Sequence, residues 1–182
     1  MNEDTIMGKE IDQYVRMLKD GDNDAFDYIY YETKNSVFLI IVSILKDYSL
    51  AEDVMQDTYM NMIKALDRYQ EGTNFKNWII TMARNLAINE YNRRKKETLV
   101  DITNENNVFG GIEDTRKYEG WLIDDVMLYL DENERQVILL RFSENMLHKD
   151  IAQALDMPLG TVLWIYQKAI KKIKKMIKKG GD

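Results

Sequence analysis

Residues that interrupt regular structure are scarce in this chain. Its 182 residues contain one proline and nine glycines, whereas lysine, glutamate, isoleucine and leucine are abundant and there are eleven methionines. Helices tolerate such a composition, but the hairpin turns of a sheet do not, because those turns depend on glycine and asparagine with a positive φ. We therefore expect an all-α protein with almost no strand.

The positions of the few breaks predict two small helical domains. Helical signals cover residues 11–19, 24–46, 49–69 and 75–96, with breaks at Gly21, Asp47 and Gly72. Residues 97–118 include several asparagines and a glycine pair, and they lack a sustained helical period, as is typical of a flexible linker. We place the domains at 1–97 and 119–182 with the linker at 98–118. We expect each domain to have its own small core.

The second domain carries signals for a helix-turn-helix. A helix is expected at 121–130, and Asp131 is a candidate N-cap with Glu134 three residues later, opening a helix at 132–142. The segments HKDIAQAL and GTVLWIYQKAIKKIKKMIKK then form two helices around the turn Asp156-Met157-Pro158. Small Ala152 allows a close crossing. The shared core is predicted to comprise Leu147, Ile151, Leu155 and Val162.

Acidic and basic stretches alternate along the chain, although the formal net charge is −6. Residues 1–60 hold 13 acidic and 5 basic side chains, 61–96 hold 3 and 8, 97–150 hold 13 and 5, and 151–182 hold 2 and 7. Each predicted domain thus has one surface for a positively charged partner and one for phosphates, which is typical of a DNA-binding adaptor. Plain solvated helix faces are the alternative interpretation.

Aromatic rings and cations interleave around Gly72, from Arg68 and Tyr69 to Phe75, Lys76 and Trp78. Rings beside cations can stack on single-stranded bases, at about 1–3 kcal/mol per base. Aromatic residues at helical spacing are more commonly part of a core. For Tyr69 and Trp78 both interpretations stay open.

Several functional classes are disfavoured. The chain has no cysteine, so it has neither disulfides nor thiolate metal sites. The apolar run 37–45 is too short to cross a bilayer and is expected to be a buried helix, and the N-terminus lacks a signal-peptide core, so we expect a cytoplasmic protein without a membrane role. Asp53 and Asp57 lack further carboxylates or histidines to complete a metal site, and His148 is expected at the surface. We expect no catalysis, no metal and no cofactor.

Three motifs in a fixed order carry a resemblance to a known family. Asp53, Gln56 and Asp57, followed by KAL at 64–66, match a DxxQE and KA[VL] pattern. The segment FKNWIITMARNLAINEYNRR follows, and GTV precedes KA and a lysine-rich end. In these features the chain resembles bacterial sigma factors of RNA polymerase, of the extracytoplasmic function (ECF) type that keeps only the second and fourth conserved regions. The resemblance covers nearly the whole chain.

The resemblance implies that the acidic helix binds core RNA polymerase. Glu52, Asp53, Gln56 and Asp57 would dock on the clamp coiled coil of the largest subunit, where carboxylates would meet a basic partner. The second domain would rest on the polymerase flap. An anti-sigma factor is the expected inhibitory partner.

The resemblance also implies contacts to promoter DNA. The loop 69–77 would capture an extruded non-template base of the minus-ten element, and the next helix would contact adjacent duplex and backbone. The implied minus-ten residues are Arg68, Tyr69, Asn74, Phe75, Lys76, Trp78, Arg84, Asn85, Asn89, Arg93 and Arg94. The implied minus-thirty-five residues are Lys149, Thr161, Trp164, Gln167, Lys168, Lys171 and Lys172.

One departure affects the minus-thirty-five assignment. Where the family usually shows lysine, serine and arginine after GTV, this chain has Leu163, Trp164 and Ile165. An apolar side chain can still touch a thymine methyl group, and Trp164 could instead pack on another protein surface. The lysine-rich end is suited to phosphate contact, which gives position rather than sequence readout.

Together these observations predict a promoter-specificity subunit. It would bind core RNA polymerase, recognise both promoter elements and enable transcription initiation. The alternative is a stand-alone dimeric helix-turn-helix regulator, which leaves the acidic helix unexplained.

Overall fold

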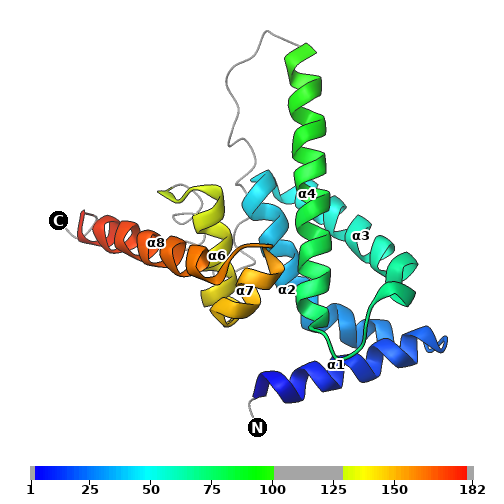
Figure 1. Ribbon diagram of the computed structural model, residues 1–182. Coiled ribbons are helices and arrows are strands. Elements are labelled where there is room, and N and C mark those ends of the chain that lie inside the picture. Colours follow the sequence, from blue (N-terminus) through cyan, green and yellow to red (C-terminus); the bar gives the residue numbers. More distant parts are fainter. Residues whose placement is uncertain (1–2, 101–128, 180–182) are drawn as a thin grey trace.

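All regular structure is helical in the residues that the computed structural model describes, 3–100 and 129–179 (Figure 1). The bounds are α1 Glu3–Lys19, α2 Ala25–Leu45, α3 Tyr48–Ala65, the short 3-10 helix η1 Leu66–Arg68, α4 Phe75–Val100, α6 Glu132–Phe142, α7 His148–Ala154 and α8 Leu159–Lys179. The prediction of an all-α protein with two helical domains is confirmed.

Two helices are longer than the sequence pattern predicts. Helix α1 begins at Glu3 rather than at residue 11, and α4 continues to Val100, beyond the expected end of the first domain at 97. Neither extension contains a proline, and adding a residue to an existing helix costs little compared with starting one. The rest of the predicted linker, and the predicted helix 121–130 except its last two residues, lie outside the described residues.

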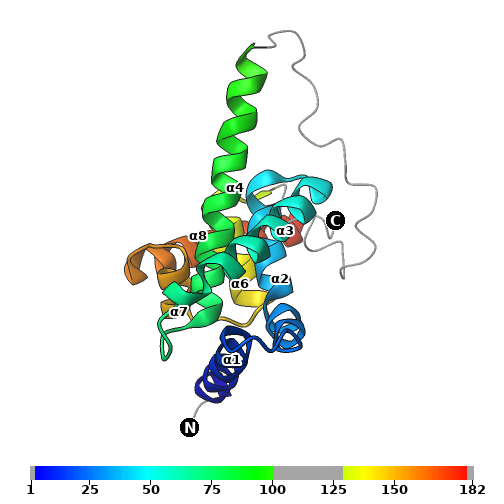
Figure 2. The same ribbon diagram turned by 90° about the vertical axis from the view of Figure 1, so that its right-hand side faces the viewer.

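Helix α2 is the centre of the first domain. It packs against α1, α3 and α4, and also against α6 of the second domain. Its residues 36–44 are buried without interruption, because neighbours cover the helix on every side. The prediction that the apolar run is a buried helix is confirmed. The C-terminal half of α4 projects past the other helices in both views (Figures 1 and 2).

The predicted breaks between these helices have local causes. Gly21 and Gly72 adopt φ values of +93° and +82°, a region that favours glycine. Asp47 is the N-cap of α3, and its side chain accepts a hydrogen bond from the Leu50 amide at 3.0 Å. These breaks fix where α3 and α4 begin.

The second domain is a helix-turn-helix built on a capped helix. Asp131 and Glu134 form the predicted capping box at the start of α6. Ile151, Leu155 and Val162 are buried between α7 and α8, as predicted. The prediction for Leu147 was wrong, since its side chain is 37% exposed. Helix α7 begins only at His148, so Leu147 has an extended backbone and leaves the helical register that the i, i+4 spacing suggested.

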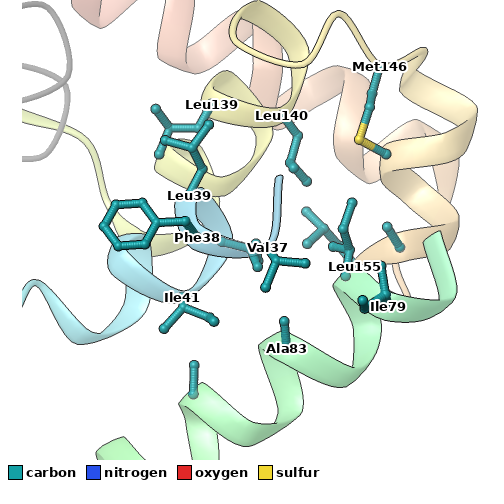
Figure 3. Close-up of a cluster of buried hydrophobic side chains, with 14 of the residues drawn as sticks. Val37, Phe38, Leu39, Ile41, Ile79, Ala83, Leu139, Leu140, Met146 and Leu155 are labelled. Carbon is teal, nitrogen blue, oxygen red and sulfur yellow. The ribbon is translucent and has the colours of Figure 1, made fainter. Parts of the chain in front are cut away.

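The two domains share one core, which corrects the expectation of two separate ones. Val37 and Ile41 of α2 and Ile79 of α4 belong to the same buried cluster as Leu140 and Leu155 of the second domain (Figure 3). A domain of about 60 residues covers only part of its apolar surface by itself, so packing the two together buries more. Sequence periodicity identifies apolar faces but does not say which partner covers them.

Candidate functional site

Helix α3 presents the predicted acidic surface. Glu52, Asp53, Gln56 and Asp57 are exposed, whereas Val54 and Thr58 on the opposite face are buried. Residues three and four positions apart lie on the same face of a helix, and these four residues have that spacing. All four residues predicted for protein docking therefore lie together and are open to a partner.

A shallow groove with an apolar floor borders the acidic surface. Phe26 and Tyr30 of α2 line it together with Tyr59, Met60 and further residues of α3. The Tyr59 hydroxyl lies 2.8 Å from Thr33 Oγ1, and burial raises the pKa of Tyr59. Met60 is 56% exposed and Ile63 47% exposed on the same helix. Carboxylates beside apolar side chains suit a partner helix that is both basic and amphipathic.

The loop before α4 is tied to α1 by a buried carboxylate. The Tyr69 hydroxyl lies 2.7 Å from Asp12 Oδ1 and 2.8 Å from the Thr73 carbonyl oxygen, while the Gly72 amide donates to Asp12 Oδ2 at 2.9 Å. Burial, and next the hydrogen bond to Asp12, raise the pKa of Tyr69. The sequence analysis missed Asp12, because nothing local links it to a loop some 60 positions away.

Most of the aromatic rings around this loop are core residues. Tyr69 and Phe75 are buried and pack edge to face, with ring centres 5.0 Å apart. Trp78 is partly exposed and contacts both rings. Of the two interpretations left open for Tyr69 and Trp78, the core role describes Tyr69 in this arrangement, whereas Trp78 keeps part of its surface exposed. Arg68 and Asn74 are exposed on the loop.

One face of α4 offers polar and cationic groups to solvent. Asn85 and Asn89 are exposed one turn apart, and Arg93 and Arg94 follow towards the projecting end. Arg93 and Arg94 each donate to Glu90, at 2.7 Å and 3.0 Å, and the hydrogen bond from Arg93 is the main reason that the pKa of Glu90 lies below its ordinary value. The amides are thus available for readout, while the guanidinium groups are pre-positioned by Glu90.

The N-terminal part of α4 contacts the second domain through an adjoining face. Lys76 Nζ lies 2.8 Å from a Glu144 carboxylate oxygen, and the Thr81 hydroxyl donates to the Ala154 carbonyl at 3.0 Å. Arg84 Nε donates to Gln136 Oε1 at 3.4 Å. Lys76 and Arg84, both predicted to contact DNA, therefore pair with protein groups here. They differ in this from Asn85 and Asn89, which are exposed.

The exposed face of α8 changes from apolar to basic along its length. Thr161, Trp164 and Gln167 are exposed, as is Lys171, and Lys149 is exposed on α7. Ile165 is only 5% exposed and belongs to the core. Of the three residues that depart from the family pattern, Leu163 and Trp164 alone can meet a ligand.

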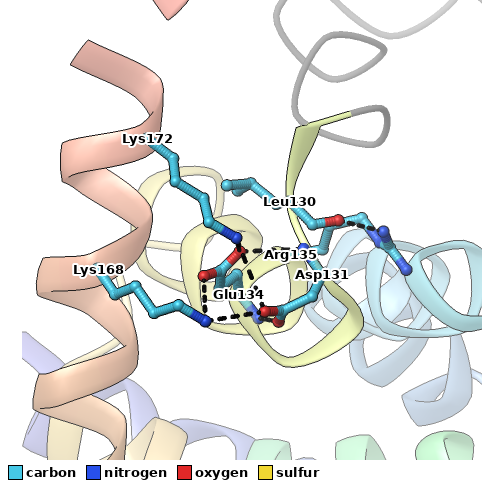
Figure 4. Close-up of polar contacts among 6 residues, drawn as sticks. All are labelled: Leu130, Asp131, Glu134, Arg135, Lys168 and Lys172. Atoms are coloured by element: carbon cyan, nitrogen blue, oxygen red, sulfur yellow. Dashed lines mark hydrogen bonds and ion pairs between the residues drawn. The ribbon is translucent and has the colours of Figure 1, made fainter. Parts of the chain in front are cut away.

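Lys168 and Lys172 of α8 are held by the cap of α6 (Figure 4). Lys168 Nζ lies 3.0 Å from Glu134 and 3.2 Å from Asp131, and Lys172 Nζ lies 2.5 Å from Glu134. Burial by itself would raise the pKa of Glu134, but the hydrogen bonds from Lys172, the Asp131 amide and Lys168 outweigh it and lower the pKa. Two of the lysines predicted to bind phosphate therefore have carboxylate partners within the chain.

Asp53 and Asp57 of α3 and His148 of α7 are the side chains that were considered in the sequence for a metal or catalytic site. The described residues contain no group of three or more histidine, aspartate or glutamate side chains placed to hold a metal ion. His148 is half-buried rather than at the surface as expected, and its ring centre lies 4.7 Å from that of Tyr166 in an edge-to-face arrangement. Burial, and next the nearby Arg141, lower the pKa of His148. Among the described helices, none has the length and apolar character needed to span a membrane.

Two family models match this chain, and their order follows the two domains. Residues 29–97 match "Sigma-70 region 2", and residues 126–175 match "Sigma-70, region 4". Together the two matches cover well over half of the chain. The first includes α3 and nearly all of α4, and the second includes the helix-turn-helix.

Characterised relatives align over most of this chain. The ECF RNA polymerase sigma factor SigW of Bacillus subtilis is 24% identical over an alignment of 170 residues. The alignment covers 84% of this chain and 88% of that protein. The RNA polymerase sigma-H factor of Pseudomonas aeruginosa is 26% identical over an alignment of 163 residues, which covers 82% of this chain and 84% of that protein.

Two solved structures share the fold. The sigma factor RpoE of Bartonella quintana, in complex with the anti-sigma factor NepR, aligns with a TM-score of 0.67 at 19% identity and covers 84% of this chain and 96% of that one. CnrH, in complex with the cytosolic domain of CnrY, also has a TM-score of 0.67, at 18% identity, over 92% of this chain and 97% of that one.

Proposed function

This chain belongs to the sigma-70 family of RNA polymerase sigma factors, and on that premise we propose how its surfaces divide the work of transcription initiation. It is a promoter-specificity subunit of the ECF type. The observation that carries this conclusion is the presence of regions 2 and 4, in that order, in one chain. We propose domain limits of 1–97 and 119–182 with the linker between them.

Core polymerase binds the acidic surface of α3. Glu52, Asp53, Gln56 and Asp57 meet basic residues of the clamp coiled coil in the largest subunit, and the adjacent groove receives its apolar side chains. The exposure of all four residues beside an apolar floor supports this assignment. Carboxylates at the rim of such an interface speed association and fix the register of the partner helix. The second domain rests on the flap.

The minus-ten element binds along the loop before α4 and the exposed face of that helix. Arg68 and Asn74 flank an extruded base, with Trp78 as the ring that keeps some exposed surface. Asn85 and Asn89 contact bases, and Arg93 and Arg94 contact the backbone. Tyr69 and Phe75 shape the loop from within, since both are buried. Lys76 and Arg84 join the site when the second domain moves away.

The minus-thirty-five element binds α8 in its major groove. Thr161, Trp164 and Gln167 lie in the first turns of the helix, where recognition helices contact base edges. Lys149 and Lys171 are exposed and suited to phosphates. Lys168 and Lys172 orient α8 through their ion pairs with Glu134. Either lysine can bind a DNA phosphate only if that phosphate replaces the Glu134 carboxylate as its partner.

The domains separate before the promoter is bound. The minus-ten and minus-thirty-five elements lie about 25 base pairs apart, or roughly 85 Å at about 3.4 Å per base pair. Domains joined through the bond between Thr81 and the Ala154 carbonyl cannot reach both elements at once. The structure therefore corresponds to a closed form of the free protein.

An anti-sigma factor is the expected regulator of the closed form. Two solved structures with the same fold contain a bound partner chain: the sigma factor RpoE is in complex with an anti-sigma factor, and CnrH is in complex with the cytosolic domain of CnrY. A partner that binds both domains of this chain holds them together and shifts the population away from the open form. We further propose that the protein acts in the cytoplasm and has no catalytic activity of its own.

The decisive test combines the purified full-length protein with core polymerase from the same organism. We expect co-elution in size-exclusion chromatography and new transcripts from a promoter library. A variant carrying Asp53→Lys and Asp57→Lys should bind polymerase about ten-fold more weakly or worse, whereas Asp20→Lys, an exposed reversal in the turn after α1, should bind normally. A wild-type protein that fails to co-elute, yet shifts duplex DNA as a dimer, is a stand-alone regulator instead.

A further inference from the structure

We propose that Leu163 and Trp164 read thymine 5-methyl groups in the minus-thirty-five element, so that this sigma factor selects that element by apolar contact. The inference rests on the proposed role of α8 as the minus-thirty-five recognition helix and names the chemistry that the helix recognises. It concerns two positions at which polar side chains are usual in the family.

The register of α8 decides which side chains can reach a base. Val162, Ile165 and Ala169 are buried against the rest of the second domain. Leu163 is 39% exposed and Trp164 is 61% exposed, in the second turn of a helix that begins at Leu159. Recognition helices contact bases through their N-terminal residues. Leu163 and Trp164 therefore occupy base-reading positions, and Ile165 does not.

Trp164 is held in place by a chain of contacts that starts in the core. Glu134 is buried at the start of α6 and binds Lys168 Nζ at 3.0 Å, as Figure 4 shows. Lys168 Nζ in turn lies 5.2 Å from the centre of the Trp164 ring, a cation–π contact. An indole that is exposed and yet held in orientation makes contact at a small cost in side-chain entropy.

The surroundings of Trp164 favour DNA over an apolar protein partner. Trp164 lines a shallow groove together with Gln167 and four lysines, among them the exposed Lys171 and Lys175. In the part of this helix whose side chains are described, no acidic residue interrupts the run. Such an arrangement matches base edges bordered by phosphates.

The chemistry of the side chains limits which base they select. Leucine has no hydrogen-bonding group, and the indole has one donor and no acceptor. The thymine 5-methyl is the apolar group that B-form DNA displays in its major groove. Contact with a methyl group removes about one CH₂ equivalent of apolar surface from water, which corresponds to roughly a 3- to 5-fold gain in affinity for each thymine.

Deoxyuridine substitution tests this directly, because uracil differs from thymine only by lacking the methyl group. The holoenzyme is assembled with the full chain on a promoter that it selects, and each thymine of the minus-thirty-five element is replaced in turn. We expect a 3- to 5-fold loss of binding at one or two positions. That loss should disappear for Leu163→Ala or Trp164→Ala and persist for the control Glu132→Ala, which lies on α6 outside the recognition helix. All three residues are exposed, so these variants keep the fold.

The outcomes separate this inference from the proposed function. If the holoenzyme selects a minus-thirty-five element but deoxyuridine has no effect at any position, the inference is overturned and the function stands. If the two alanine variants keep promoter selection and lose affinity for core polymerase, the surface binds protein and the inference is again overturned. If no such element is selected, both assignments fall.

Discussion

Glu134→Ala should destabilise the second domain and loosen α8 at the same time. The Glu134 side chain is 1% exposed and binds three groups: the Asp131 amide at 3.0 Å, Lys168 at 3.0 Å and Lys172 at 2.5 Å. Alanine keeps the helix but removes all three contacts. It leaves the Asp131 amide without its partner, and it leaves Lys168 and Lys172 of the DNA-facing helix with Asp131 alone, at 3.2 Å and 3.8 Å.

The expected cost follows from how buried each partner is. Loss of the capping box costs about 1 kcal/mol. The lysine side chains are 41% and 40% exposed, so they regain water when Glu134 is removed, and each ion pair counts for no more than about 1 kcal/mol. The free energy of unfolding should fall by about 1–3 kcal/mol, which corresponds to a decrease in Tm of roughly 2–12 °C for a chain of this size.

Urea unfolding followed by circular dichroism measures this difference. Glu134→Gln should lose about half as much stability. Its amide oxygen still accepts the hydrogen bond from the Asp131 backbone amide, but its negative charge, and with it both ion pairs, is gone. The control Glu132→Ala removes an acidic residue from the same helical turn, where it is exposed, and should change stability by no more than about 0.5 kcal/mol. An effect of Glu134→Ala as small as that of the control would refute the assignment of Glu134 as the anchor of α8.

Three further predictions concern acid stability, the closed form and the loop before α4. The pKa values of Glu134 and Asp131 are lowered in the folded state. The two ionised carboxylates therefore stabilise the fold above about pH 4, and this contribution is lost as the pH falls through their folded pKa values. In an acid titration, Glu134→Gln should lose less stability than the wild type. Glu144→Ala removes the acceptor for both Ser36 and Lys76, and so removes two contacts between the domains. The ratio of closed to open protein should fall about 5- to 30-fold, which small-angle scattering should detect as a larger radius of gyration. An unchanged radius of gyration would contradict this. Tyr69→Phe deprives the buried Asp12 of one donor and should cost about 1–3 kcal/mol in urea unfolding, a result that an unchanged midpoint would exclude.

Local signals predicted the breaks between helices and the start of α6. The capping box of Asp131 and Glu134 depends on residues three positions apart, and Gly72 needs only its own backbone freedom to make a turn. Because these effects act within one helical turn, the sequence contains all the information needed to find them. The acidic surface of α3 is equally local, since its residues share a face by spacing alone.

Contacts between distant segments could not be predicted in the same way. Asp12 meets Tyr69 across 57 positions, and Thr81 meets the Ala154 carbonyl across 73. An isolated aspartate in an amphipathic helix has the same pattern whether it is solvated or buried. For this reason the sequence identified Tyr69 as a candidate without finding the carboxylate that holds it, and identified Lys76 and Arg84 without finding the domain that covers them.

The closed form covers Lys76 and Arg84, two residues of α4 that are also proposed to contact the promoter, and this overlap links regulation to DNA binding. Lys76, Thr81 and Arg84 each have a polar partner in the second domain, so opening the protein exposes a cationic and hydrogen-bonding surface. Promoter DNA supplies phosphate oxygens to those groups, and water supplies weaker partners. The free energy of opening is therefore subtracted from the free energy of promoter binding. Any partner that binds the closed form more tightly than the open form lowers promoter binding, and so represses transcription, through the same equilibrium.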